Sequence, residues 1–173
     1  MKKYGHYGYA ALFGMLCLAL MGFSGAASAG EVPLGGFTLH TAPGGGMVNT
    51  SDLLGSPVLM IFFTPNCPAC EKELAVLDPL AASYEESWGV KILPVAPGGL
   101  RSQAARLEEF VRERWGVASL EIYIDGDPGM MQAHKVEYVP TLVLYDKEGK
   151  QIWKETGAVP AATLEKLFEE KLQ

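Results

Sequence analysis

The sequence predicts a three-layer α/β/α fold, in which a central mixed sheet carries a C-terminal antiparallel hairpin. An apolar run at residues 58–63, a helix-forming stretch and a second apolar run at 90–96 follow one another in the order of a parallel βαβ unit. Further along, two strand-like segments around a turn precede a last helix-forming stretch. The 173 residues are 49% hydrophobic and 20% charged, which fits one globular domain.

The first 29 residues have the features of a secretory signal peptide. Lys2 and Lys3 precede an apolar run at 10–23, and residues 27–29 (Ala-Ser-Ala) form a small-x-small cleavage pattern. The run is shorter than the ~20 residues that a membrane-spanning helix needs, so a retained anchor is the weaker alternative. Removal of both lysines would take the formal net charge from −6 to −8. That acidity disfavours nucleic acid and anionic membranes as partners.

The glycine-rich residues 30–46 come next, and we expect a lead-in arm or an edge hairpin there, ahead of the domain proper at 47–173. The run at 58–63 is apolar without alternation, which is typical of a strand covered on both faces. We therefore expect this strand to lie at the centre of the sheet.

Residues 67–88 carry leucines at helical spacing, so a helix is expected there, with a kink at Pro79. Gly89 ends it, and the inner strand at 90–96 follows. Residues 102–115 then mix apolar side chains with Glu and Arg in the pattern of an amphipathic helix. These elements complete the alternating part of the fold.

The last third begins with a short strand at 120–125. Asp127 and Pro128 suit the cap and first turn of a short helix that follows this strand. Strands at 141–145 and 150–154 flank a turn and predict a hairpin, which a helix at 160–172 covers.

The chemistry lies in Cys67-Pro68-Ala69-Cys70, where the central strand turns into a helix. Free backbone N–H groups and the dipole at a helix N-terminus favour an anion, so we expect Cys67 to have a lowered pKa and to attack disulfides as a thiolate. Cys70, one turn on and facing inward, is expected to resolve the mixed disulfide. Pro68 and Ala69 suit the first helical turn and stiffen this active-site loop.

Two cysteines at this spacing are also half of a zinc site. Tetrahedral coordination needs about two more ligands, and after residue 29 the chain adds only His40 and His134, which are not spaced as a ligand pair. We therefore expect no metal and no cofactor beyond a reversible Cys67–Cys70 disulfide, and we expect His134 to be an ordinary helix residue.

These motifs resemble the thioredoxin superfamily, and within it the exported TlpA/ResA-like thiol–disulfide oxidoreductases. Residues 58–70 are similar to the family's strand and active-site motif, and Glu73 completes a C-x-x-C-x-x-E pattern. Val139-Pro140-Thr141 resembles the family's cis-proline loop. The resemblance covers nearly all of the chain after residue 29. It implies that Pro140 is cis and faces the cysteines, and that Val139 offers its backbone to a bound substrate.

The resemblance also implies a function. We expect an enzyme, monomeric and located in the bacterial periplasm or at the outer face of the cytoplasmic membrane, that reduces protein disulfides. Its partners would be disulfide-bonded proteins and a membrane-bound or soluble thiol electron donor, with cytochrome c maturation as one setting. An oxidase of secreted proteins and a copper metallochaperone remain alternatives, because Pro-Ala does not fix the direction of transfer and two thiols can bind Cu(I).

Several departures from the family pattern bear on mechanism. Ile61 stands where cytoplasmic thioredoxins have a buried Asp, and Asn66 where they have Trp, so a cytoplasmic housekeeping reductase is disfavoured. The loop at 96–99 lacks the acidic residue that ResA-like proteins carry there. This loop therefore gives no support to acid-assisted proton handling, and we interpret Glu73 as a solvated helix residue or an ion-pair partner.

Overall fold

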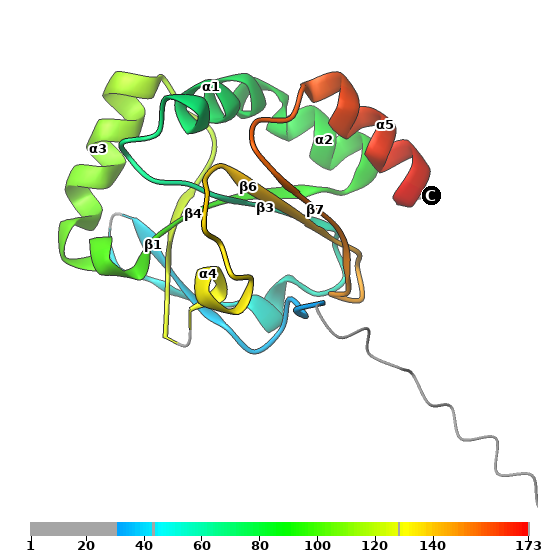
Figure 1. The fold of residues 1–173 in the computed structure, drawn as a ribbon, viewed down its shortest axis with the longest axis horizontal. Helices are drawn as coiled ribbons and strands as arrows, with labels where there is room; N and C mark the ends of the chain where they lie inside the picture. Colours follow the sequence, from blue (N-terminus) through cyan, green and yellow to red (C-terminus); the bar gives the residue numbers. More distant parts are fainter. Residues whose placement is uncertain (1–30, 43, 128, 173) are drawn as a thin grey trace, which may run out of the picture.

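The computed structural model describes residues 31–42, 44–127 and 129–172, so the expected signal peptide at 1–29 lies outside the described residues. Within them, seven strands form one mixed sheet in the order β2-β1-β5-β4-β3-β6-β7 (Figure 1). The strands are β1 (Thr38–Ala42), β2 (Met47–Asn49), β3 (Val58–Phe62), β4 (Lys91–Ala96), β5 (Ile122–Asp125), β6 (Thr141–Tyr145) and β7 (Gln151–Thr156).

The centre of the sheet is parallel and its flanks are antiparallel. β3, β4 and β5 run in one direction, β6 pairs antiparallel with β3, and β1 pairs antiparallel with β5. The connecting helices are α1 (Pro68–Leu77), α2 (Ala81–Trp88), α3 (Ala104–Trp115), α4 (Met130–Ala133) and α5 (Ala161–Lys171). The predicted three-layer α/β/α class and the C-terminal hairpin are confirmed.

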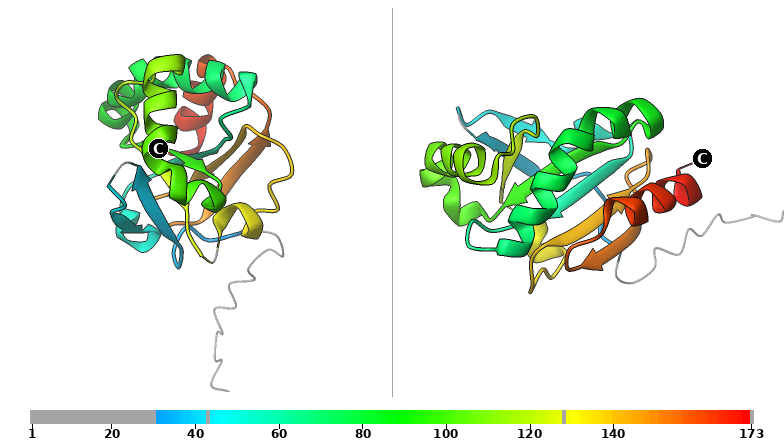
Figure 2. Two further views of the ribbon diagram at one scale, coloured as in Figure 1. Left: turned by 90° about the vertical axis from the view of Figure 1, so that its left-hand side faces the viewer. Right: turned by 90° about the horizontal axis from the view of Figure 1, so that it is seen from above.

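The helices divide unevenly between the two faces of the sheet. α1, α2, α3 and α5 lie over one face and α4 over the other, as Figure 1 and the left view of Figure 2 show. Each face has its own apolar core, because alternate side chains of a strand point to opposite sides. Leu59 and Ile61 of β3 enter the larger core, whereas Met60 and Phe62 enter the smaller one. β3 is therefore fully buried, as its unbroken apolar run predicts.

The long helical stretch after β3 is interrupted where proline predicts it. Residues Asp78–Leu80 form a 3-10 turn around Pro79, between α1 and α2. Gly89 ends α2 and Gly116 ends α3, both in the left-handed conformation that glycine adopts without steric cost. These local signals set the ends of both helices.

The glycine-rich segment is more closely integrated than an arm. β1 and β2 form an antiparallel hairpin, and the other edge of β1 pairs with β5. The expected division between residues 46 and 47 falls just ahead of β2, within this hairpin. Gly126 allows the close approach, because a Cβ there would clash with the carbonyl oxygen of Thr38. Composition alone did not reveal a pairing with a strand so far along the chain.

The short helix before β6 is capped by a residue other than the predicted one. The buried carboxylate of Asp125 accepts the N–H groups of Met130 at 2.8 Å and Met131 at 2.9 Å. The predicted cap, Asp127, is therefore wrong, and Pro128 lies outside the described residues. Asp125 is the last residue of β5, so the sheet itself holds the start of α4.

Candidate active site

The two cysteines form a disulfide at the carboxyl end of β3. Cys67 is the N-cap of α1 and Cys70 lies in its first turn, with their Cα atoms 5.2 Å apart. Cys67 is partly exposed, whereas Cys70 is fully buried in the larger core. An incoming disulfide can therefore reach the Cys67 sulfur but not the Cys70 sulfur.

The start of α1 favours negative charge on the accessible sulfur. The Cys70 N–H points at Cys67 Sγ at 3.1 Å, and Pro68 occupies the first helical position, where a missing N–H costs nothing. Once the disulfide is reduced, this N–H and the helix dipole would stabilise a thiolate on Cys67. The geometry agrees with the predicted roles of the pair, which remain predictions.

The loop that contains Pro140 faces this sulfur. The Val139–Pro140 bond is cis, as expected, and the Val139 carbonyl oxygen lies 3.5 Å from Cys67 Sγ. A disulfide sulfur carries no hydrogen, so this is a contact, which becomes a possible hydrogen bond only in the dithiol. Within the described residues, no hydrogen bond occupies the Val139 amide. That amide is open to a bound strand, and substrate binding by Val139 stays a prediction.

Glu73 is buried, in contrast to the exposed position expected from the sequence. It is 5% exposed and lies one turn beyond Cys70 on the inward face of α1. Its Oε2 accepts the Val159 N–H at 3.0 Å, and its Oε1 is buried with no hydrogen-bond partner among the described residues. The expectation of a solvated or ion-paired residue is wrong, because the segment before α5 covers the side chain.

Burial has a chemical consequence for Glu73. Desolvation raises its pKa to about 7, even though the bond from Val159 acts in the opposite direction. Glu73 also lines a pocket of about 230 Å³, together with Val76 and Pro160. The inward spacing of Cys70, Glu73 and Leu77 was the sequence signal that could have revealed this burial.

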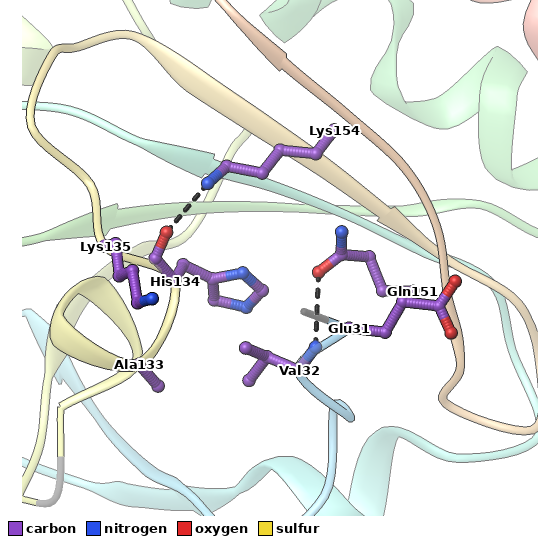
Figure 3. A pocket seen from close by; sticks show the side chains of 7 residues that line it. All are labelled: Glu31, Val32, Ala133, His134, Lys135, Gln151 and Lys154. Atoms are coloured by element: carbon purple, nitrogen blue, oxygen red, sulfur yellow. Dashed lines mark hydrogen bonds between the residues drawn. The ribbon is translucent and has the colours of Figure 1, made fainter. Parts of the chain in front are cut away.

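His134 lies on the other face of the sheet, in contact with the smaller core. Its Nε2 is hydrogen-bonded to the Tyr145 hydroxyl, and its carbonyl oxygen accepts Lys154 Nζ at 2.7 Å. Burial, followed by the charge of Lys154, lowers its pKa to about 4. A pocket of about 370 Å³ opens beside it, where the Val32 N–H donates to Gln151 Oε1 at 3.4 Å (Figure 3). The ring is thus a packed side chain at the end of α4.

Two features are absent from the described residues, a cluster of metal ligands and a membrane-spanning helix. No group of three or more His, Cys, Asp or Glu side chains there is placed to hold a metal ion. In the same part of the chain, no helix combines the length and the apolar character that crossing a bilayer requires.

The known proteins that this chain resembles agree with the geometry of the cysteine site. A family model described as a thioredoxin-like domain matches residues 48–172. The thiol-disulfide oxidoreductase ResA of Halalkalibacterium halodurans is 28% identical over 125 residues, which cover 72% of this chain and 68% of that protein. ResA of Geobacillus kaustophilus is 31% identical over 119 residues, or 69% of this chain and 65% of that one.

Among solved structures, MTB dsbF, described in mixed oxidised and reduced forms, superposes with a TM-score of 0.64 at 25% identity. The superposition covers 78% of this chain and 93% of that one. The family model alone spans well over half of the chain, and the cysteine pair lies within the matched residues. The chain therefore belongs to the thioredoxin-like family and is a thiol–disulfide oxidoreductase.

Proposed function

We propose that the chain is an extracytoplasmic dithiol reductant, which passes two electrons from Cys67 and Cys70 to a disulfide of another exported protein. The unequal exposure of the two sulfurs carries the proposal, because one can meet a substrate while the other waits behind it. The direction is supported by the similarity to ResA proteins, and the location by the signal-like features at 1–29.

The reaction proceeds in two exchanges. The Cys67 thiolate attacks one sulfur of the substrate disulfide, and the other substrate sulfur leaves as a thiolate that takes up a proton. Cys70 then loses its proton and attacks Cys67 Sγ, which releases the second substrate thiol. The substrate gains two electrons and two protons, and the protein ends as the Cys67–Cys70 disulfide.

Glu73 is suited to the second exchange. Cys70 is buried, so its thiol cannot pass a proton directly to bulk water. Glu73 lies on the same helix face, has a pKa of about 7, and carries an oxygen without a hydrogen-bond partner among the described residues. We propose that it accepts the Cys70 proton and returns it to solvent through the adjoining pocket.

The surface beside Cys67 would bind the substrate, and a thiol donor would regenerate the dithiol. An extended substrate segment can pair with the open Val139 amide beside Cys67, which is the expected role of the Val139–Pro140 loop. Oxidised protein returns to the dithiol by exchange with a membrane-bound or soluble thiol donor. We propose exported proteins as substrates, with cytochrome c maturation as one setting, and a monomer as the working unit.

One observation favours the opposite direction of transfer. The Cys70 N–H that points at Cys67 Sγ stabilises the thiolate, and a stabilised reduced form makes a dithiol–disulfide couple more oxidising. An oxidase of secreted proteins is therefore the second candidate.

The reduction potential of the Cys67–Cys70 couple separates the two candidates. We would equilibrate the protein in dithiothreitol or glutathione buffers and quantify the dithiol by alkylation and mass. The Cys67→Ser variant, which cannot form the pair, supplies the baseline. A potential near about −250 mV or below is expected for a reductant, whereas a value near about −120 mV would overturn that direction and establish the oxidase.

A further inference from the structure

Tyr138 is a large, exposed aromatic residue next to the loop that contacts Cys67. Its side chain is 71% exposed. Single exposed aromatic residues are ordinary in soluble proteins, so exposure alone would mean little. Tyr138, however, directly precedes Val139, whose carbonyl oxygen lies 3.5 Å from the accessible sulfur of Cys67. The other large exposed apolar side chains of the described residues are Met47, Leu54 and Val76, none of which adjoins that contact in the chain.

The backbone beneath this ring is held in place. The Tyr138 carbonyl oxygen accepts the Thr141 hydroxyl at 2.7 Å, and Thr141 Oγ1 lies 3.3 Å from Thr156 Oγ1 on β7. Thr141 itself is buried and begins β6. The sheet therefore fixes where the ring projects. Tyrosine on a fixed backbone makes contact area at low entropic cost, which is why binding surfaces favour it.

The stretch of sequence around the disulfide carries no charge. Residues 62–70 include no Asp, Glu, Lys or Arg, although the chain has a formal net charge of −6. Asn66, Pro68 and Ala69 are exposed there, and Val139 is partly exposed. A substrate side chain that approaches Cys67 therefore meets mostly apolar groups beside the one amide of Asn66, with no ion-pair partner among residues 62–70.

The position of Tyr138 beside Val139 decides which substrate residue would meet its ring. Both residues lie in a bend before β6, where Val139 packs partly into both cores while Tyr138 faces solvent. An extended substrate advances about 3.3 Å per residue, so one that pairs with Val139 brings its neighbouring residue alongside Tyr138.

We propose that Tyr138 determines specificity by contacting the residue next to the substrate's cysteine, and that this surface selects extended polypeptides with an apolar side chain there. The inference rests on the proposed function and names the substrate class of the same site. Tyr138 does not touch the reacting sulfurs, so it acts on substrate choice and not on the exchange itself.

The test compares two substrates within each variant. Two disulfide-bonded peptides would differ only at the residue beside the attacked cysteine, Leu in one and the similarly shaped but polar Asn in the other. The dithiol form of the full chain would reduce each, and the ratio of the two kcat/KM values would be measured. Tyr138→Ala is expected to lower the Leu-to-Asn ratio about fivefold, the size of a good cross-strand aromatic contact.

Two variants make the result specific. Tyr138→Phe keeps the ring and should keep the ratio, and Met47→Ala removes an equally exposed apolar side chain on the distant strand β2 and should also keep it. If Tyr138→Ala slows both peptides by the same factor, or leaves the ratio unchanged, the inference is overturned while the proposed function stands. If the unaltered dithiol reduces neither peptide, the proposed function fails and this inference fails with it.

Discussion

Two buried carboxyl groups lie five residues apart, Glu73 within α1 and Asp78 just past its last residue, and they have opposite properties. Asp78, just past α1, accepts the N–H groups of three successive residues at 2.8–3.0 Å, those of Ala118, Ser119 and Leu120. Burial acts to raise its pKa, but these bonds and the nearby Arg112 outweigh it, so the pKa is lowered. Glu73 has one such bond, and its pKa is raised to about 7.

Surface exposure does not distinguish them, since Asp78 is 7% exposed and Glu73 is 5% exposed. Glu73 lies deeper and is more strongly desolvated, and it also has fewer N–H donors, each of which favours the charged form of a carboxyl group. Asp78 is thus held as an anion that fastens the segment before β5 to the helix. Glu73 is left able to change charge near neutral pH. Asp78 is therefore structural, and Glu73 is reactive.

The largest effect on activity should come from substitution of the two cysteines. Cys67→Ser removes the accessible sulfur, and we expect protein-disulfide reduction to fall by at least ~10³-fold, to the uncatalysed background. Cys70→Ser should instead accumulate a mixed disulfide with substrate, visible by mass, because the attacking sulfur remains but nothing resolves it. A Cys67→Ser protein that still reduced substrate catalytically would show that the two sulfurs have been assigned the wrong roles.

Substitution of Asp78 should lower the stability of the fold. Asp78→Ala leaves three N–H groups without their acceptor, and we expect a loss of about 3 kcal/mol in the free energy of unfolding, measured in urea. Because the folded pKa of Asp78 is lowered, its contribution is present above the unfolded pKa and is lost as pH falls through the folded pKa. The loss should therefore shrink in acid. A variant as stable as the parent at pH 7 would contradict the assigned role.

Glu73→Gln sharpens the contrast. The folded pKa is raised from 4.5 to about 7, so the stability linked to this group is complete below pH 4.5 and is lost as pH rises to about 7. The variant should regain about 2 kcal/mol at pH 6 relative to the parent. It should also resolve the mixed disulfide about tenfold more slowly at pH 7, since the proton acceptor is gone.

Glu71→Gln is the matched control for that variant, because Glu71 lies on the same helix and is partly exposed. It should change neither the pH dependence of stability nor the resolution rate. Equal effects of the two substitutions would mean that the charge of the helix, and not the buried proton, is responsible.

His134 extends the comparison to a buried base and should give the smallest effect. Its folded pKa is lowered from 6.5 to about 4, so its contribution is present above pH 6.5 and is lost as pH falls toward 4. This trend opposes that of Glu73 between about pH 4.5 and 6.5. Urea titrations at pH 5.5 should show His134→Gln reducing the acid loss by about 1 kcal/mol, with the Glu73→Gln protein losing stability more steeply in the same window.

What the sequence could predict was local. The apolar run of β3, the cysteines at a helix start, the kink at Pro79 and the helix end at Gly89 each depend on residues a few positions apart, and all four are present. The cis bond before Pro140 came from resemblance and is present too.

What it could not predict depends on contacts between distant segments. Glu73 looks like a surface residue of an amphipathic helix until Val159, which follows the hairpin, is folded over it. The cap of α4 was assigned to the nearer Asp127, although only the strand geometry of β5 aims Asp125 at the helix start. The pairing of β1 with β5 left no periodic signal in a glycine-rich segment.

That pairing also bears on the order in which the chain can fold. β1 is the first strand along the chain, yet its partner β5 is the fifth, and the parallel unit of β3 and β4 lies between them in sequence. During synthesis the free edge of β1 must therefore wait until residue 125 has emerged before it is paired. The unit that bears the two cysteines needs no such closure, because α1 follows β3 in the chain. The strand and helix that carry the disulfide can thus form before the sheet is complete, whereas the Val139–Pro140 loop joins them later.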